Sequence, residues 1–99
     1  MNVNEVVLSG TVHDLNDLRY TPAGIPVLEF SVRHMSTQAE AGTSRRVELD
    51  MPAIAFGNVA QRLAQASEAS RSIMARGFLA KRSMRSTQVV LHARDIEFQ

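Results

Sequence analysis

The chain has no cysteine, only five aromatic side chains and no long apolar run. Without cysteine there can be no disulfide, no thiolate metal site and no thiol nucleophile. No stretch reaches the roughly 18 apolar residues that a membrane-spanning helix needs, and the N-terminal residues lack the basic and apolar parts of a signal peptide. These absences predict a cytoplasmic protein with no membrane partner.

The length of 99 residues suits one domain, residues 1–99, with a single modest core. The net charge of +1 hides an uneven distribution. Residues 1–50 hold four arginines against seven acids, whereas residues 51–99 hold six arginines and one lysine against three acids. Codon usage in a GC-rich genome explains the excess of arginine over lysine equally well, but it does not explain the segregation. Arginine binds phosphate through a planar, forked donor, so the second half of the chain suits a nucleic-acid partner.

Three segments alternate apolar and polar residues as half-buried strands do, namely residues 5–13, 27–35 and 45–57. Gly10 in the first strand permits the close approach of another strand, and Pro52 in the third requires an edge or a bulge. The alternation predicts a core that contains Val6, Leu8, Val12, Leu28, Phe30, Val32, Val47, Leu49, Met51, Ala53 and Ala55.

The segments between these strands differ in kind. Residues 14–26 are rich in turn formers, with a turn expected over 21–24, and residues 36–44 read as a polar loop. The apolar period then changes to that of a helix, which is predicted over 58–70 with Asn58 as its N-cap. The residues that give this period are Val59, Leu63 and Ala66.

Two further strands are expected near 71–80 and 87–98, joined by the basic hairpin tip AKRSMRST at 80–87. The resulting order, β-β-β-α-β-β, is that of the OB-fold, an all-β, five-stranded Greek-key barrel with one short helix between strands 3 and 4. In that fold the loops at 14–24 and 80–87 flank the ligand face.

Catalysis is not expected. His13, His34 and His92 fall on three different strands without the spacing of metal ligands, and no serine lies in a Gly-x-Ser-x-Gly turn. Glu48 and Asp50 are interpreted as a solvated sheet face rather than a catalytic pair. The sequence therefore predicts neither an enzyme nor a metal or cofactor site.

Binding of single-stranded nucleic acid is expected instead, because cations gather at loops and strand ends that the fold brings to one side of the barrel. A groove of this kind holds the backbone of a single strand, and aromatic side chains stack on its bases. For any one arginine, an ordinary solvated charge remains the alternative. The candidate nucleic-acid-binding residues are Arg19, Tyr20, Arg33, His34, Arg45, Arg46, Lys81, Arg82 and Arg85.

Aromatic platforms are scarce on this surface. Phe30 faces inward, and Phe56 and Phe78 point away from the core, where they are expected to pack under the helix or at a subunit contact. Apart from Tyr20, stacking then depends on arginine planes. Phosphate contacts should therefore dominate, which predicts modest and strongly salt-dependent affinity.

The order of four segments resembles bacterial single-stranded-DNA-binding proteins. The segments are VVLSGTV, RYTPAGIPVLEFSVRH, AFGNVAQRLAQ and RGFLAKRS. In those proteins a strand with a central glycine precedes Arg-Tyr-x-Pro-x-Gly, and Phe-Gly opens the helix. The short length and the ending VVLHARDIEF resemble more specifically the primosomal replication protein N (PriB) family.

This resemblance implies a homodimer of OB-folds that binds single-stranded DNA and helps to restart stalled replication forks together with PriA helicase and DnaT. By position, it implies DNA contacts from Arg19, Arg45, Lys81, Arg82 and Arg85.

Three positions depart from the family pattern. Thr43 and Glu48 stand where better-known members carry aromatic residues, and Met35 stands where a basic residue is expected. The hypothesis that follows is weaker DNA binding and greater dependence on the protein partner.

Two other functions remain open. One is a general single-stranded-DNA-binding protein, although the chain ends at Gln99 without a Gly/Gln/Pro-rich tail. The other is a protein-interaction OB module whose hairpin meets acidic partner surfaces, with incidental DNA binding. Charge reversal of Lys81, Arg82 and Arg85 tests the second function. Loss of DNA binding with helicase stimulation intact supports separate surfaces, and loss of both supports a shared one.

Dimerisation also has a physical motive. The first strand is apolar, and no lysine or proline protects its edge, which invites pairing with a second copy. The alternative is that the last strand or the helix covers this edge.

Overall fold

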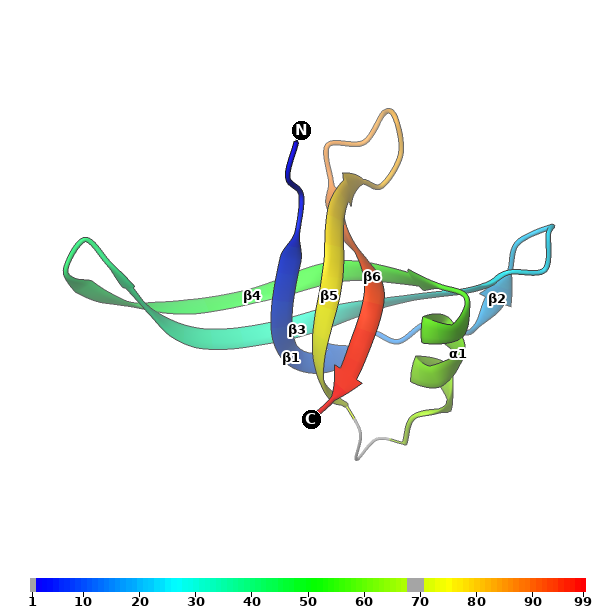
Figure 1. The fold of residues 1–99 in the computed structure, drawn as a ribbon, viewed down its shortest axis with the longest axis horizontal. Helices are drawn as coiled ribbons and strands as arrows, with labels where there is room; N and C mark the ends of the chain where they lie inside the picture. The colour runs from blue at the N-terminus through cyan, green and yellow to red at the C-terminus, as the bar shows by residue number, and fades with distance from the viewer. Residues whose placement is uncertain (1, 68–70) are drawn as a thin grey trace.

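A computed structural model describes residues 2–67 and 71–99 (Figure 1). Within them, six strands and one helix follow one another along the chain. They are β1 (Val6–His13), β2 (Arg19–Tyr20), β3 (Pro26–Glu40), β4 (Thr43–Phe56), α1 (Asn58–Gln65), β5 (Ser72–Lys81) and β6 (Val89–Phe98).

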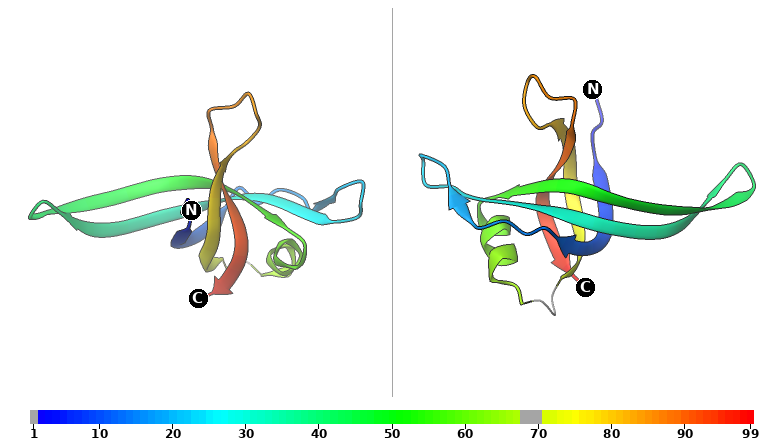
Figure 2. Two further views of the ribbon diagram at one scale, coloured as in Figure 1. Left: turned by 45° about the horizontal axis from the view of Figure 1, so that its top comes forward. Right: turned by 180° about the vertical axis from the view of Figure 1, so that it is seen from behind.

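The strands close into a barrel. Their order is β1-β5-β6-β4-β3-β2, and an additional antiparallel pairing of β1 with β3 closes the sheet. The pairing of β4 with β6 is parallel. With α1 between β4 and β5, the architecture confirms the predicted OB-fold, and the short β2 is an addition inside the predicted turn region. Figure 2 shows the long β3–β4 ribbon crossing the barrel.

The predicted alternation is confirmed inside the barrel. Leu28, Phe30 and Val32 of β3 are buried, and so are Ala53 and Ala55 of β4. The second half of the chain completes the core with Leu63, Ile73, Leu91 and Ile96. Each large side chain buried in this way contributes about 1.5–3 kcal/mol to the stability of the fold.

The prediction of a polar loop over residues 36–44 is wrong. β3 and β4 pair without interruption from Val27↔Phe56 to Glu40↔Thr43, and the connection consists of Ala41 and Gly42 only. Both residues have positive φ, 51° and 78°, as in the two-residue turns whose twist matches that of the flanking strands. The side chains of this ribbon are polar on both faces, so the sequence shows no alternation there. Backbone hydrogen bonds hold the ribbon without a buried face.

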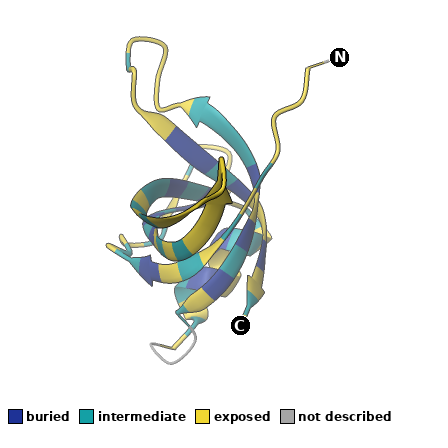
Figure 3. Ribbon diagram, turned by 90° about the vertical axis from the view of Figure 1, so that its left-hand side faces the viewer, coloured by how far each residue is buried: buried dark blue, intermediate teal, exposed yellow. Residues whose placement is uncertain are grey.

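We call the part of this ribbon over residues 33–50 the arm. Figure 1 shows it projecting from the barrel on the side away from β2, and Figure 3 shows that its far end is exposed. Val47 and Leu49, predicted in the core, are only half-buried because they lie on the arm. Arg33 and His34 are therefore in mid-strand rather than at a strand end, and Arg45 and Arg46 lie near the tip of the arm.

Two predictions about backbone geometry are confirmed. A Cβ atom on Gly10 would collide with the carbonyl oxygen of Arg33, so glycine is required where β1 crosses β3. Pro52 lies one residue before the register of β4 with β6 begins, where β3 is the only partner strand of β4 within residues 2–67 and 71–99. The turn predicted over 21–24 also forms, because the Gly24 amide donates to the Thr21 carbonyl at 2.8 Å.

The helix is shorter than predicted. α1 begins after Gly57, which takes the N-cap position expected for Asn58, and ends at Gln65. Ala66 is extended, and the remainder of the predicted helix, residues 68–70, lies outside the described residues. Ala60 and Leu63 already bury the apolar face on the barrel, so a further turn has little left to bury. None of the described residues form a helix long and apolar enough to cross a membrane.

Candidate nucleic-acid interface

Glu29 joins two basic segments that are far apart in the sequence. Its Oε2 accepts a hydrogen bond from Arg19 Nη1 of β2 at 2.7 Å, and its Oε1 accepts one from Arg82 Nη1 at 2.8 Å. Arg82 lies in the hairpin loop, residues 81–88, which we define to include Lys81 at the end of β5. The Arg82 Nε group also donates to Gln88 Oε1 at 2.7 Å. The structure therefore places the predicted contact residues Arg19 and Arg82 side by side.

The two arginines lower the pKa of Glu29 below its ordinary value of 4.5, chiefly through the hydrogen bond from Arg19 and then through that from Arg82. The carboxylate is therefore ionised at neutral pH and offsets one of the two positive charges. Both arginines remain about half exposed, so their other N–H groups are available to a ligand.

A cleft of about 330 Å³ surrounds this arrangement, and we call it the arginine groove. Its lining residues are Arg19, Glu29, Ile54, Phe56, Arg82, Val90 and His92. Tyr20, the neighbour of Arg19 on β2, is 59% exposed. The groove thus combines cations with an apolar wall, which is the composition that a nucleotide needs.

The loop that connects β5 to β6 carries cations without acids. Its tip is held by local bonds, because Lys81 Nζ donates to the Met84 carbonyl at 2.9 Å and the Arg82 amide donates to the Gln88 carbonyl at 3.0 Å. Lys81 and Arg85 form no ion pair within the described part of the chain. Met84 is 92% exposed at the tip.

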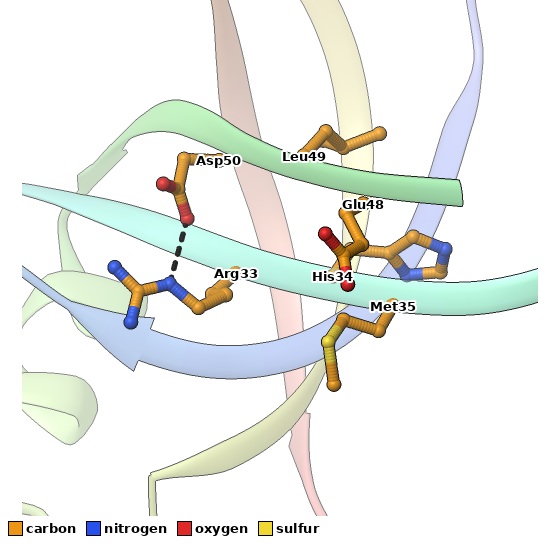
Figure 4. Close-up of a pocket in the computed structure, with 6 residues that line it drawn as sticks. All are labelled: Arg33, His34, Met35, Glu48, Leu49 and Asp50. Carbon is orange, nitrogen blue, oxygen red and sulfur yellow. Dashed lines mark hydrogen bonds and ion pairs between the residues drawn. The ribbon is translucent and has the colours of Figure 1, made fainter. Parts of the chain in front are cut away.

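The arm carries as many cations, but they are neutralised. Each of its arginines lies within 3.0 Å of a carboxylate oxygen, and the pairs are Arg33–Asp50, Arg45–Glu40 and Arg46–Glu48. Figure 4 shows the first pair at a cleft of about 410 Å³, where Met35 and Glu48 lie beside each other. The expectation that all cations reach one side of the barrel is wrong, because the long ribbon carries Arg45 and Arg46 away from the hairpin loop.

His34 has a structural environment. Its Nδ1 lies 2.7 Å from the Ser9 carbonyl oxygen and its Nε2 lies 2.8 Å from Ser36 Oγ. Because a carbonyl oxygen only accepts, Nδ1 carries a proton. The ring therefore ties the base of the arm to β1.

Sequence reasoning missed several residues of this surface. Glu29 is an outward-facing acid on a predicted strand, and only the register of β2 with β3 and the course of the hairpin loop reveal its two arginine partners. Phe56 and Phe78 do face outward, but they stack on His92 rather than packing under α1. The sequence alternation correctly indicated that both phenylalanines face outward, but it could not show that both stack on His92.

Comparison with known proteins gives concordant results. A family model described as "Another single-strand binding protein family" matches residues 4–95. The chain is 43% identical over 95 residues to the replication restart protein PriB of Nitrosomonas europaea, which covers 96% of this chain and 87% of the relative. It is 37% identical over 100 residues to the PriB protein of Yersinia pseudotuberculosis, which covers 99% of this chain and 95% of the relative.

Solved structures agree in fold. The PriB protein from Ralstonia solanacearum superposes with a TM-score of 0.85 at 28% identity, covering 99% of both chains. The wild-type single-stranded DNA binding protein from Thermus aquaticus superposes with a TM-score of 0.75 at 24% identity, covering 98% of this chain and 50% of that one. The second likeness concerns the fold alone.

Proposed function

Because this chain belongs to the single-strand binding protein family, and within it to the PriB family of replication restart proteins, we propose that it binds single-stranded DNA as a non-enzymatic accessory protein of the replication-restart primosome. The observation that supports this most is the meeting of Arg19 and Arg82 on Glu29, beside a hairpin loop with three cations and no acid. Its place of action is the cytoplasm, where the chromosome is replicated.

The arginine groove binds phosphate through spare donors. Arg19 uses one bond and Arg82 uses two to hold their positions on Glu29 and Gln88, and a guanidinium has five N–H groups. Lys81 and Arg85 extend the positive surface along the hairpin loop. An unpaired strand is flexible enough to follow this curved path, whereas a duplex resists bending on this scale.

The arm is a weaker contact surface in this proposal. Arg33, Arg45 and Arg46 each exchange a carboxylate for a phosphate when DNA arrives, so the net gain of each contact is small. In this proposal His34 and Tyr20 lie beside the path of the DNA strand and do not determine that path. With Thr43 and Glu48 in place of aromatic residues, the affinity is modest and the protein partner contributes more.

Fluorescence anisotropy with single-stranded and duplex oligonucleotides tests this function at about 50 mM and about 200 mM salt. The expected result is preference for the single strand and a steep loss of affinity as salt rises. A flat salt dependence, or equal binding of the duplex, would contradict the proposed backbone contacts.

The protein partners proposed from family membership are PriA helicase and DnaT. The exposed Met84 at the hairpin tip favours one competing function, in which the loop contacts an acidic protein surface and DNA binding is incidental. Stimulation of helicase unwinding by a charge-reversed hairpin distinguishes the two. Loss of DNA binding with stimulation intact means separate surfaces, and loss of both means a shared one.

A homodimer is proposed through the edge of β1. Among the described residues, positions 6–10 of β1 pair only with β5, Thr11 pairs with both β5 and β3, and Val12 and His13 pair with β3. Val7 on this strand is 58% exposed. An open apolar edge pairs readily with a second copy across a two-fold axis. A solution mass of one chain, or a mass unchanged by Val7→Lys, would contradict this interface.

A further inference from the structure

Asn4 continues the ladder of hydrogen bonds between β1 and β5 with its side chain. Its Nδ2 donates to the Leu79 carbonyl oxygen at 2.7 Å, and its Oδ1 accepts a bond from the Leu79 amide at 2.9 Å. The register of β1 with β5 ends at the pair Val6↔Gly77, so Leu79 is the residue that would face Asn4 if the ladder continued. A carboxamide has the donor and the acceptor of a peptide group, and here it takes the place of one more strand residue beside β5.

The base of the hairpin loop has little other support within the described residues. On the β6 side, the register with β4 does not extend past Leu91 toward the loop, and on the β5 side the ladder with β1 ends at Gly77. The pairs of β5 with β6 beyond Leu79↔Leu91 therefore form a two-stranded ribbon, which is only marginally stable by itself. Figure 1 shows the N-terminal segment running beside β5 toward this ribbon, where Asn4 bonds to its base.

The hairpin loop itself is held together by its own bonds. The backbone amide and the Nε group of Arg82 donate to the carbonyl oxygen and the Oε1 of Gln88 at 3.0 Å and 2.7 Å. The Gln88 amide in turn donates to Ser86 Oγ at 3.0 Å. A loop bonded in this way moves as a unit about its base, so contacts that reach outside it set its direction. The ion pair of Arg82 with Glu29 is one such contact, and the bonds of Asn4 at the base are another.

We propose that Asn4 is a positioning residue for DNA binding, because its pairing with Leu79 holds the hairpin loop in the direction that brings Arg82 to the arginine groove. This inference rests on the proposed function and adds to it a residue that carries no charge and needs no contact with the DNA. Without the bonds to Leu79, the loop samples other directions. The apparent affinity then falls in proportion to the fraction of molecules in which the loop is in place.

The test compares Asn4→Ala with Asn2→Ala, the matched control, because Asn2 is exposed on the same N-terminal segment. Asn4→Ala should weaken the binding of a thymidine oligonucleotide about fivefold, because two hydrogen bonds that hold the loop are lost. The slope of the affinity against salt should stay unchanged, since every cation is retained. Asn4→Gln keeps a donor and an acceptor and should recover part of the loss, whereas Asn2→Ala should bind like the wild type.

The same substitution in a K81Q/R82Q/R85Q background shows whether Asn4 acts through the loop. Without its cations the loop contributes little to binding, so its direction no longer matters and Asn4→Ala should cause no further loss. Nuclear magnetic resonance of the DNA-free protein gives an independent readout. The Leu79 amide should exchange with solvent faster in Asn4→Ala, and the amide resonances of residues 81–88 should shift or broaden.

The outcomes separate this inference from the proposed function. If the wild type binds no single-stranded DNA, the proposed function fails, and the role of Asn4 in binding fails with it. If the wild type binds DNA, the positioning role alone is overturned by any of three results: Asn4→Ala binds equally well, it loses the same factor in the K81Q/R82Q/R85Q background, or it leaves the resonances of the loop unchanged. A loss of affinity accompanied by a halved solution mass would also overturn it, because Asn4 would then act on the proposed dimer.

Discussion

The arm and the hairpin loop carry the same number of cations, yet they present different surfaces to a ligand. On the arm, three arginines meet three carboxylates at 3.0 Å or less. The hairpin has three cations and no acid. Among the described residues, the only carboxylate that pairs with one of these cations is Glu29, which is shared with Arg19. A count of basic residues therefore does not predict positive potential, because the register decides which cations are neutralised.

The largest effect is expected from reversing the hairpin charges with K81E/R82E/R85E. This variant should weaken the binding of single-stranded DNA at least about a hundredfold at low salt and reduce the salt slope by about two units, because about three phosphate contacts are lost. Anisotropy titrations at several salt concentrations measure both quantities.

The matched control is the same reversal on the arm, R33E/R45E/R46E. It should cost about tenfold, less than the hairpin variant, because the loss comes from repulsion by the added carboxylates rather than from lost phosphate contacts. Equal losses for the two triple variants would mean that the ion pairs of the arm open fully on the DNA.

A smaller effect of opposite sign is expected when the acids of the arm are neutralised with E40Q/E48Q/D50N. Three arginines then lose their partners and the arm becomes a second basic surface, so binding should tighten about tenfold at low salt. The control E5Q/D14N/D95N changes the net charge equally at exposed positions off the arm. A similar gain from the control would show that net charge, rather than the location of the pairs, governs affinity.

Within the arginine groove, Glu29→Gln should tighten binding about threefold at low salt, because both arginines are released from a shared counter-charge. Glu48→Gln, which releases a single arginine on the arm, is the comparison. Weaker binding by Glu29→Gln would mean that the carboxylate acts mainly by holding Arg19 and Arg82 in place.

The smallest effect concerns stability. The pKa of Glu29 is lower in the folded protein than its ordinary value of 4.5, so this group stabilises the fold above that pH, and its contribution is lost as the pH falls through the lower folded-state value. Because the arginine partners are about half exposed, the contribution should be below about 1 kcal/mol. Urea unfolding of the wild type and Glu29→Gln should show this gap at pH 7 and lose it at increasingly acid pH. If the difference in the free energy of unfolding between the two proteins persisted at acid pH, it would come from packing rather than from the charge of Glu29.

The secondary structure of a segment could be predicted from the sequence where that segment contacts the core, and not where it does not. The burial of Leu28, Phe30 and Val32 was predictable because a barrel interior imposes a two-residue period on its strands. Residues 36–44 were not recognised as strand because neither face of the arm is buried there, so no period marks them. The end of α1 was missed because alanines continue the apolar pattern beyond the last residue that packs on the barrel.

The candidate site was predictable as a set of cations but not as an arrangement. That Arg19 and Arg82 share Glu29 depends on the pairing of β2 with β3 and on the course of the hairpin loop. The stacking of Phe78 on His92 depends on a one-residue shift after Arg76, which places these two residues opposite each other. A pattern within one strand carries no information about such cross-strand registers.

The arm is also the part of the described molecule where we expect local opening of the backbone hydrogen bonds. With a radius of gyration of 14.5 Å and a longest extent of 50 Å, the chain is more drawn out than a compact protein of this length, for which about 13 Å is typical. A two-stranded ribbon without a third strand is only marginally stable by itself. The arm is thus attached to the barrel where His34 contacts β1, and its amide protons should exchange with solvent progressively faster toward Ala41. If the amide protons were protected from exchange equally along the whole arm, a second copy of the chain would have to lie over it.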